Sequence, residues 1–303
     1  MSLIFGIDLG GTKTEGIVLD SSQQYAQITR IRIPTERDKG YTHILDNIEG
    51  LLNRLSESCG QSPKKLGIGT PGAFDPSTQT IKNSNTTCLI GQPLKKDLQD
   101  RLGMEVRFAN DANCFALAET KMGIIPEMVP NAEVVFGIIL GTGVGGGIVI
   151  RGQILQGLHN IGGEWGHNFL DVSGGKCYCG RSGCVETILS GPALEAYYHT
   201  LSQTKRKLAD IYKRHVAGID AHATNTIRRL IAHFGKALGP VINLIDPQAV
   251  VIGGGLGNIG LLYSEGRNEV AKYVFNSRME TRILKPKLGD SAGVLGAALL
   301  VES

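Results

Sequence analysis

Apolar residues follow two spacings along this chain, and both spacings occur in each half. Short apolar or alternating runs bounded by glycine or serine are typical of strands. They occur at residues 3–9, 14–20, 28–33, 66–70, 105–108, 134–140, 147–151 and 250–252. Apolar residues at every third or fourth position predict helices, at residues 41–58, 94–101, 112–122, 222–245 and 291–300. Because strands alternate with helices in both halves, the predicted fold class is α/β.

The composition is that of a globular protein with one large domain or two smaller ones. The chain has 303 residues, and 42% of them are hydrophobic, which is enough for a real core. Lys and Arg number 31 against 28 Asp and Glu, so the net charge is +3. This balance argues against a nucleic-acid partner, for which a concentrated basic surface is expected. Glycine is the exception, because 41 glycines are about twice the usual share.

No segment predicts export or membrane insertion. The beginning of the chain lacks a basic stretch followed by a long apolar one, which a signal peptide requires. The longest uncharged run, from Val134 to Ile150, has 17 residues and contains six glycines. It therefore predicts two strands joined by a turn and not a spanning helix. We expect a cytoplasmic protein with reduced cysteines and no membrane partner.

Three glycine-rich segments each follow a predicted strand. They are DLGGTKT at 8–14, LGTGVGGG at 140–147 and GGGLG at 253–257. Turn glycines let backbone N–H groups approach phosphate oxygens, threonine hydroxyls add donors, and Asp8 offers oxygen ligands to a phosphate-bound Mg²⁺. Two matches to the dinucleotide-binding fingerprint fail, because one precedes a strand and the other leaves too little chain. The segments therefore predict a shared nucleotide site, with three plain turns as the alternative.

Four potential metal ligands lie in an irregular stretch between residues 155 and 190. Cys177, Cys179 and Cys184 have the spacing C-x-C-x₄-C, and His167 precedes them with nine residues between. Three thiolates and one imidazole complete the tetrahedral shell of a structural Zn²⁺. The alternative is three buried free cysteines, which pack as small apolar residues.

Together these motifs resemble the ROK family of sugar kinases, within the actin-like, hexokinase-type ATPase superfamily. The matching segments are DLGGTKT at 8–14, ANDANC at 109–114, LGTGVGGG at 140–147, GEWGH at 163–167, CYCGRSGCVE at 177–186 and VVIGGG at 250–255. The resemblance runs in order along essentially the whole chain. GEWGH combined with the cysteine segment is its most specific part.

The resemblance implies two ribonuclease-H-like α/β domains with an active-site cleft between them. Residues 1–120 and a returning C-terminal helix at about 290–303 would form a small first domain. Residues 121–289, with the zinc-binding segment 167–184, would form the larger second domain. Repressors of the family carry a helix-turn-helix ahead of the first glycine segment. That segment begins here at residue 8, so a repressor is not expected.

For the sugar, the resemblance implies Asp111 as the general base that takes the proton of the attacking hydroxyl. An ordinary helix N-cap is the alternative interpretation of this residue. The other implied sugar-binding residues are Gly72, Asn85, Asn110, Glu164, His167 and Glu186. His167 would give one ring nitrogen to Zn²⁺ and the other to a sugar hydroxyl. Surface salt bridges are the alternative for the two glutamates.

For ATP, the same resemblance implies that the phosphates are bound by the first two glycine segments and adenosine by the third. The implied phosphate-binding residues are Gly10, Gly11, Thr12, Thr14, Thr142 and Gly143. Gly253, Gly254 and Gly255 would bracket the adenosine, and Asp8 would hold Mg²⁺. Lys13 is not assigned to the site, because its position in a strand does not determine which way it points.

The choice of sugar depends on two short segments. KNSNTT at 82–87 and GQPL at 91–94 resemble most the fructokinase, mannokinase-type branch of the family. The expected reaction is therefore the ATP-dependent phosphorylation of fructose to fructose 6-phosphate. N-acetylglucosamine or another hexose is the alternative substrate, and a non-catalytic sugar-binding regulator is the alternative of another class. Family members are commonly dimers, so a homodimer is expected.

Overall fold

The chain divides into two compact units. The computed structural model describes residues 2–84 and 86–302. Unit 1 contains the chain up to Pro126, the segment Gly147–Gly162 and the chain from Lys287 onwards; unit 2 contains Glu127–Gly146 and Gly163–Pro286. The sequence placed all of residues 121–289 in the second domain, whereas Gly147–Gly162 belongs to unit 1. Local pattern could not reveal this, because the segment joins unit 1 through tertiary contacts.

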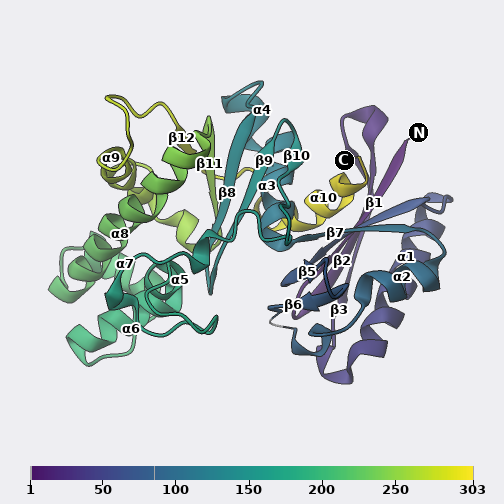
Figure 1. Ribbon diagram of the computed structural model, residues 1–303, viewed down its shortest axis with the longest axis horizontal. Coiled ribbons are helices and arrows are strands. Elements are labelled where there is room, and N and C mark those ends of the chain that lie inside the picture. The colour runs from purple at the N-terminus through teal and green to yellow at the C-terminus, as the bar shows by residue number, and fades with distance from the viewer. Residues whose placement is uncertain (1, 85, 303) are drawn as a thin grey trace. The chain divides into compact units, whose positions relative to one another are not determined.

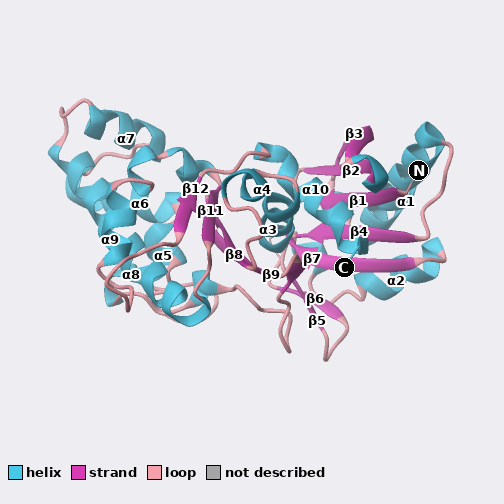
Figure 2. Ribbon diagram, turned by 90° about the horizontal axis from the view of Figure 1, so that it is seen from above, coloured by secondary structure: helices cyan, strands magenta, loops and turns pink. Residues whose placement is uncertain are grey.

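Unit 1 is built on a five-stranded sheet in the order β3-β2-β1-β4-β7, which can be followed from top to bottom in Figure 2. Its strands are β1 (Leu3–Leu9), β2 (Lys13–Asp20), β3 (Ala26–Pro34), β4 (Lys65–Thr70) and β7 (Glu105–Asn110). β2 is antiparallel to both of its neighbours, whereas β1, β4 and β7 are parallel. The carboxyl ends of these three strands therefore meet at one edge of the sheet, where ligands commonly bind in α/β proteins.

Helices cover both faces of this sheet (Figure 1). α1 (Tyr41–Cys59) and α2 (Leu94–Leu102) bury their apolar residues in one core with Phe5 and Ile7 of β1. On the other face, α10 (Ala292–Leu299) approaches so closely that a Cβ at Gly6 would lie 2.2 Å from the backbone nitrogen of Ala298. α10 also packs against α3 (Asp111–Lys121). The C-terminal helix thus completes the core of unit 1.

A second five-stranded sheet has the order β10-β9-β8-β11-β12. Its strands are β8 (Val134–Leu140), β9 (Val144–Ile150), β10 (Gln153–Ile154), β11 (Ala249–Gly253) and β12 (Arg282–Leu284). β11 is parallel to both β8 and β12. The helices of this part of the chain are α4 (Ile124–Met128), α5 (Glu186–Leu189), α6 (Gly191–Ser202), α7 (Leu208–Val216), α8 (Ala221–Ile245) and α9 (Glu265–Ala271).

The strands and helices expected from the apolar pattern are present, and β9 shows the largest difference, beginning at Val144 and not at 147. Several short elements were not predicted: the pair β5 (Ala73–Asp75) and β6 (Thr80–Lys82), the strands β10 and β12, and the helices α4 to α7 and α9. Most of them are short; α7, for example, has nine residues and buries Leu208 and Ile211. No helix within residues 2–84 and 86–302 is long and apolar enough to cross a membrane.

Candidate functional site

The carboxyl edge of the unit 1 sheet brings together the first group of predicted residues. Strand register aligns Asp8 of β1 with Gly69 of β4, and Thr70 of β4 with Asn110 of β7. Asp111 follows Asn110 directly and begins α3. Asp8 and Asn110, which are 102 positions apart in the sequence, therefore lie near the same edge of the sheet on strands separated only by β4.

Gly72 lies two residues beyond the end of β4 at the same edge. Its φ is +83°, and a Cβ there would lie 2.5 Å from the Lys82 carbonyl oxygen, so this turn requires glycine. The other residue predicted to line the site from this region, Asn85, lies outside the residues that the structure describes.

Asp111 occupies the first turn of α3, but it does not cap the helix. The Asn113 N–H donates to Asn110 Oδ1 at 2.8 Å, so Asn110 is the N-cap and the alternative interpretation of Asp111 is wrong. The Ala112 N–H donates to Asp111 Oδ1 at 2.8 Å. The surrounding protein displaces water and raises the pKa of Asp111, although that N–H acts in the opposite direction. The residue as a whole nevertheless keeps exposed surface, from which a ligand can reach it.

Asp8 is half-buried between two glycines. A Cβ at Gly69 would lie 3.4 Å from Asp8 Oδ1, and one at Gly293 would lie 2.6 Å from Oδ2, so Gly293 in particular leaves room for the carboxylate. Burial raises the pKa of Asp8 to about 6, and the negative charges of Asp111 and Glu15 add to this effect. A cation bound at this edge of the sheet would relieve the repulsion.

Replacing Asp8 by Asn is expected to stabilise the ligand-free protein at pH 8. The pKa of Asp8 is about 6 in the folded chain and about 3.9 in an unfolded one, so the ionised carboxylate lowers the free energy of unfolding. This destabilisation grows between about pH 4 and pH 6, is fully present above pH 6 and is absent below pH 4. The free energy of unfolding of Asp8→Asn should exceed that of the wild type by about 3 kcal/mol at pH 8 and should equal it near pH 4. Urea unfolding at several pH values measures this. The exposed Asp38→Asn is the control, and equal stabilities of Asp8→Asn and wild type at pH 8 would contradict the prediction.

The turn between β1 and β2 is braced from the interior by threonines. The Gly10 N–H donates to the Lys13 carbonyl at 3.0 Å. The Thr35 hydroxyl donates to the Gly10 carbonyl at 2.7 Å and lies 2.9 Å from the Thr14 hydroxyl. Thr14 is 1% exposed, so its side chain supports the turn from inside. Of the predicted phosphate-binding residues in this turn, Thr12 is exposed and Gly11 is half-buried.

The turn between β8 and β9 carries Thr142 and Gly143 and is held by Glu186. Glu186 Oε2 accepts a hydrogen bond from the Val144 N–H at 2.8 Å. A Cβ at Gly143 would lie 2.6 Å from the same oxygen. Thr142 is exposed at the tip of the turn. One residue predicted to bind the sugar therefore touches the turn predicted to bind phosphate, within unit 2.

The third glycine segment lies beside the second. Gly253, the last residue of β11, pairs with Ile139 of the parallel strand β8, so the two strands end side by side. Gly254 has a φ of +77°, and a Cβ there would lie 2.3 Å from the Leu140 carbonyl oxygen. Gly255 follows and is exposed. Close packing of backbone on backbone therefore requires glycine at this junction.

Trp165 anchors the segment that carries Glu164 and His167. The segment forms a short 3-10 helix, Trp165–His167, which begins after Glu164. Trp165 Nε1 donates to the Gly145 carbonyl at 3.1 Å, and its ring packs edge-to-face on Phe136 with centroids 5.7 Å apart. Both contacts lie within unit 2 and hold Glu164 and His167 close to the start of β9.

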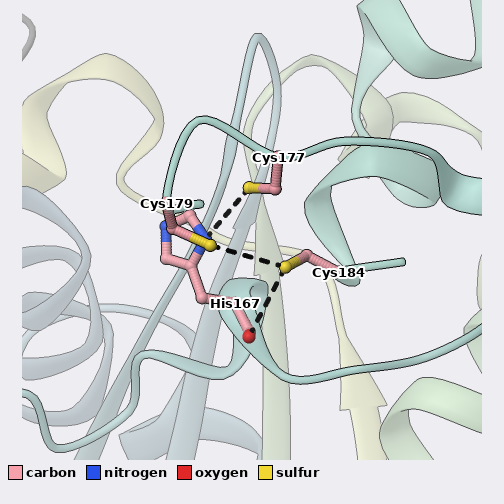
Figure 3. Close-up of side chains that lie close together, drawn as sticks. All are labelled: His167, Cys177, Cys179 and Cys184. Carbon is pink, nitrogen blue, oxygen red and sulfur yellow. Dashed lines mark hydrogen bonds between the residues drawn. The ribbon is translucent and has the colours of Figure 1, made fainter. Parts of the chain in front are cut away.

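The four predicted metal ligands point toward one centre (Figure 3). The ligand atoms of His167, Cys177, Cys179 and Cys184 all lie within 4.8 Å of one another. The Sγ atoms of Cys179 and Cys184 are 3.7 Å apart, and Cys177 Sγ lies 3.5 Å from His167 Nδ1. A tetrahedron with zinc–sulfur bonds of about 2.3 Å and zinc–nitrogen bonds of about 2.0 Å has edges of about 3.5–3.8 Å. The donor set and its spacing therefore fit Zn²⁺.

Tyr178 lies between the first two cysteines and had no role in the sequence analysis. Its hydroxyl is 2.9 Å from His167 Nε2, and the two rings meet edge-to-face with centroids 5.0 Å apart. Since Nδ1 faces the cysteines, Nε2 is the nitrogen expected to reach a sugar hydroxyl. A hydroxyl of the chain itself occupies that position. The sequence shows an aromatic residue between two ligands, but it does not show where the side chain turns.

The predicted site residues thus form two groups, each within one unit. The group in unit 1 consists of Asp8, Gly10, Gly11, Thr12, Gly72, Asn110 and Asp111, with Thr14 behind the turn. The group in unit 2 consists of Thr142, Gly143, Glu164, His167, Cys177, Cys179, Cys184, Glu186, Gly253, Gly254 and Gly255.

Comparison with known proteins matches the ROK family model to residues 4–303 of the chain. An N-acetyl-D-glucosamine kinase of Vibrio vulnificus is 34% identical over 308 residues, which cover 98% of this chain and 99% of that protein. The N-acetyl-D-glucosamine kinase of Yersinia enterocolitica is 36% identical with the same coverage. Family model and relatives therefore span nearly the entire chain.

Two solved structures share the fold. The ROK hexokinase from Thermus thermophilus superposes with a TM-score of 0.86 at 28% identity, covering 98% of this chain and 97% of the other. The ROK family glucokinase from Streptomyces griseus, solved with glucose and AMPPNP, gives a TM-score of 0.76 at 28% identity, with 98% of each chain covered. The chain belongs to the ROK family and is a sugar kinase with the actin/hexokinase-like α/β ATPase fold.

Proposed function

We propose that this chain is an ATP-dependent kinase that transfers the γ-phosphate to a hydroxyl of N-acetyl-D-glucosamine. The observation that carries this choice of sugar is the likeness to two N-acetyl-D-glucosamine kinases, at 34% and 36% identity over 98% of the chain. Fructose, the sugar expected from residues 82–87 and 91–94, has no support among these relatives. The alternative that the sequence left open is therefore the better supported one.

In unit 1, Asp111 accepts the proton of the attacking sugar hydroxyl. Its accessible carboxylate and its raised pKa suit a general base, because a base works best when its pKa approaches the working pH. Asn110 is fixed as the N-cap of the helix that begins at Asp111. Asp8 holds the Mg²⁺ that accompanies the phosphates, directly or through water. Gly10, Gly11 and Thr12 bind phosphate oxygens from the turn between β1 and β2.

In unit 2, the two adjacent glycine turns bind the nucleotide. Thr142 and Gly143 contact phosphate oxygens, and the segment from Gly253 to Gly255 borders the adenosine. The glucokinase from Streptomyces griseus, which was solved with glucose and AMPPNP, supports a nucleotide substrate for this fold. Since phosphoryl transfer has a loose transition state, positioning and charge neutralisation contribute more than the base does.

The sugar hydroxyls are bound by Glu164, His167 and Glu186, whose positions depend on the cysteine segment. Zn²⁺, when bound by His167 and the three cysteines, supplies a structural cross-link and no reactive ligand position. Glu186 comes two residues after Cys184 and also bonds to the Val144 N–H. When the sugar binds, one of its hydroxyls replaces the Tyr178 hydroxyl as the hydrogen-bond partner of His167 Nε2.

A coupled assay of ADP release over a panel of sugars tests the proposal. We expect the highest kcat/KM for N-acetyl-D-glucosamine, and lower values for glucose, mannose, N-acetylmannosamine and fructose. A kcat/KM for fructose at or above that for N-acetylglucosamine would restore the first expectation. Sugar binding without turnover of any member of the panel would favour the non-catalytic regulator.

A further inference from the structure

Unit 1 contains a cavity beside Asp111 that the predicted site does not explain. Five of its lining residues have polar, uncharged side chains: Thr70, Asn110, Asn113, Gln156 and Asn160. Its apolar wall includes Phe74 and Phe108, and none of the residues that line it carries a charge. Only Asn110 among these was assigned to the sugar. The cavity is therefore suited to a neutral group that combines polar and apolar atoms.

Asn113 is the lining residue whose side-chain oxygen has no hydrogen bond within the described part of the chain. It is 5% exposed, and its side-chain oxygen Oδ1 is buried without a hydrogen bond among the described residues. Its backbone N–H is already used by Asn110 Oδ1. A buried carbonyl oxygen without a hydrogen bond destabilises the free protein, and a bound group that carries an N–H or O–H can supply the missing donor. Asn113 lies in the first turn of α3, as Asp111 does, and its side-chain oxygen lies close to Gly147.

Gln156 and Asn160 each use one amide N–H to hold their side chains in place. Gln156 Nε2 donates to the Phe108 carbonyl at 3.5 Å, and Asn160 Nδ2 donates to the Phe74 carbonyl at 3.1 Å. These bonds tie the segment Gly147–Gly162 to the rest of unit 1 and leave the side-chain oxygens as acceptors. The cavity therefore offers neutral amide groups and two aromatic rings.

We propose that this cavity is the subsite for the acetamido group of the sugar, with Asn113 hydrogen-bonding to that group. The inference rests on the proposed function and extends it to named residues. An acetamido group has an N–H donor and a C=O acceptor, which match the amides, and a methyl group, which matches Phe74 and Phe108. A carboxylate or phosphate in the same place would find no cation to pair with.

The test compares two sugars that differ only at C2, where glucose has a hydroxyl and N-acetylglucosamine an acetamido group. For Asn113→Ala we expect kcat/KM for N-acetylglucosamine to fall about 10–100-fold, mainly through KM, because a site built for a hydrogen bond discriminates strongly. The value for glucose should change less than about threefold, which also shows that the variant folds. Asn268→Ala, an exposed position on α9, should leave both sugars unaffected.

Gln156→Ala provides a second variant that is independent of helix α3. Gln156 is exposed, so the replacement is tolerated, and we expect a smaller loss, about 3–10-fold, again confined to N-acetylglucosamine. Equal losses of kcat/KM for both sugars in these variants would overturn the proposed subsite while the proposed function stands. An unchanged KM of Asn113→Ala for N-acetylglucosamine would do the same. If the wild type instead prefers a plain hexose, the proposed function fails. Calorimetric titration with N-acetylglucosamine then tests whether the cavity binds the acetamido group. Weaker binding by Asn113→Ala than by the wild type supports the subsite, and equal dissociation constants overturn it.

Discussion

Asp111→Asn is expected to lower kcat by about 10²–10⁴-fold, the contribution of a general base, while the sugar dissociation constant changes less than about threefold. The amide keeps the shape of the side chain and can still accept the N–H of Ala112, but it cannot take up a proton. Stability should also persist, because the helix cap is Asn110 and not Asp111. Steady-state kinetics and sugar titration by calorimetry measure the two effects separately.

The control for this variant is Asp100→Asn, which changes an exposed carboxylate on α2 and should leave kcat unaltered. A decrease of less than tenfold in Asp111→Asn would mean that another group takes the proton. A parallel loss of turnover and sugar affinity would instead make Asp111 a binding residue.

Removal of the metal from the cysteine cluster is expected to abolish sugar binding, with an affinity loss of at least about 100-fold. The cluster connects three parts of unit 2, because Val185 N–H bonds to the Asn168 carbonyl, Cys184 Sγ contacts the His167 carbonyl, and Glu186 bonds to Val144. Without Zn²⁺, His167 and Glu186 lose their common support. Metal analysis, followed by sugar titration before and after chelation, measures this, and added Zn²⁺ should restore binding.

Cys184→Ser should reproduce the effect of chelation, since Cys184 is fully buried in the cluster. The matched control is Cys59→Ser, at the end of α1 and remote from the cluster in sequence and contacts, which should keep both zinc and sugar affinity. A zinc-free protein with the Michaelis constants of the wild type would refute the structural role. A protein purified without zinc that nevertheless binds sugar would refute the metal assignment itself.

The glycine segments illustrate how much of the site could be predicted from local sequence. Each was recognisable because glycine and threonine follow an apolar strand, and the structure places each after β1, β8 or β11. Their environment was not predictable. Thr14 faces Thr35 inside unit 1, and Gly143 adjoins Glu186, which is 43 positions away in the chain. Side-chain direction at a strand end depends on what packs behind it, and that information is not local.

The regions where prediction failed are short or depend on long-range packing. α6, α7 and α9 are short, with 12, nine and seven residues. Gly147–Gly162 belongs to unit 1 although it contains most of β9 and all of β10, which are strands of the second sheet. Asn113 was part of a recognised motif, but an unpaired amide becomes visible only when all of its neighbours are in place.

The order of residues along the chain was sufficient to establish the α/β class, the main strands and helices, the zinc-type donor set and the family. These features depend on the spacing of residues that are close in the sequence, and strand and helix periods and metal coordination each require a characteristic spacing. The folded arrangement was needed to identify Asn110 as the helix cap, to place the Tyr178 hydroxyl on His167, and to gather Asn113, Gln156 and Asn160 around one cavity. Such contacts join segments that are distant in sequence or depend on side-chain direction, and both are set only when the core packs.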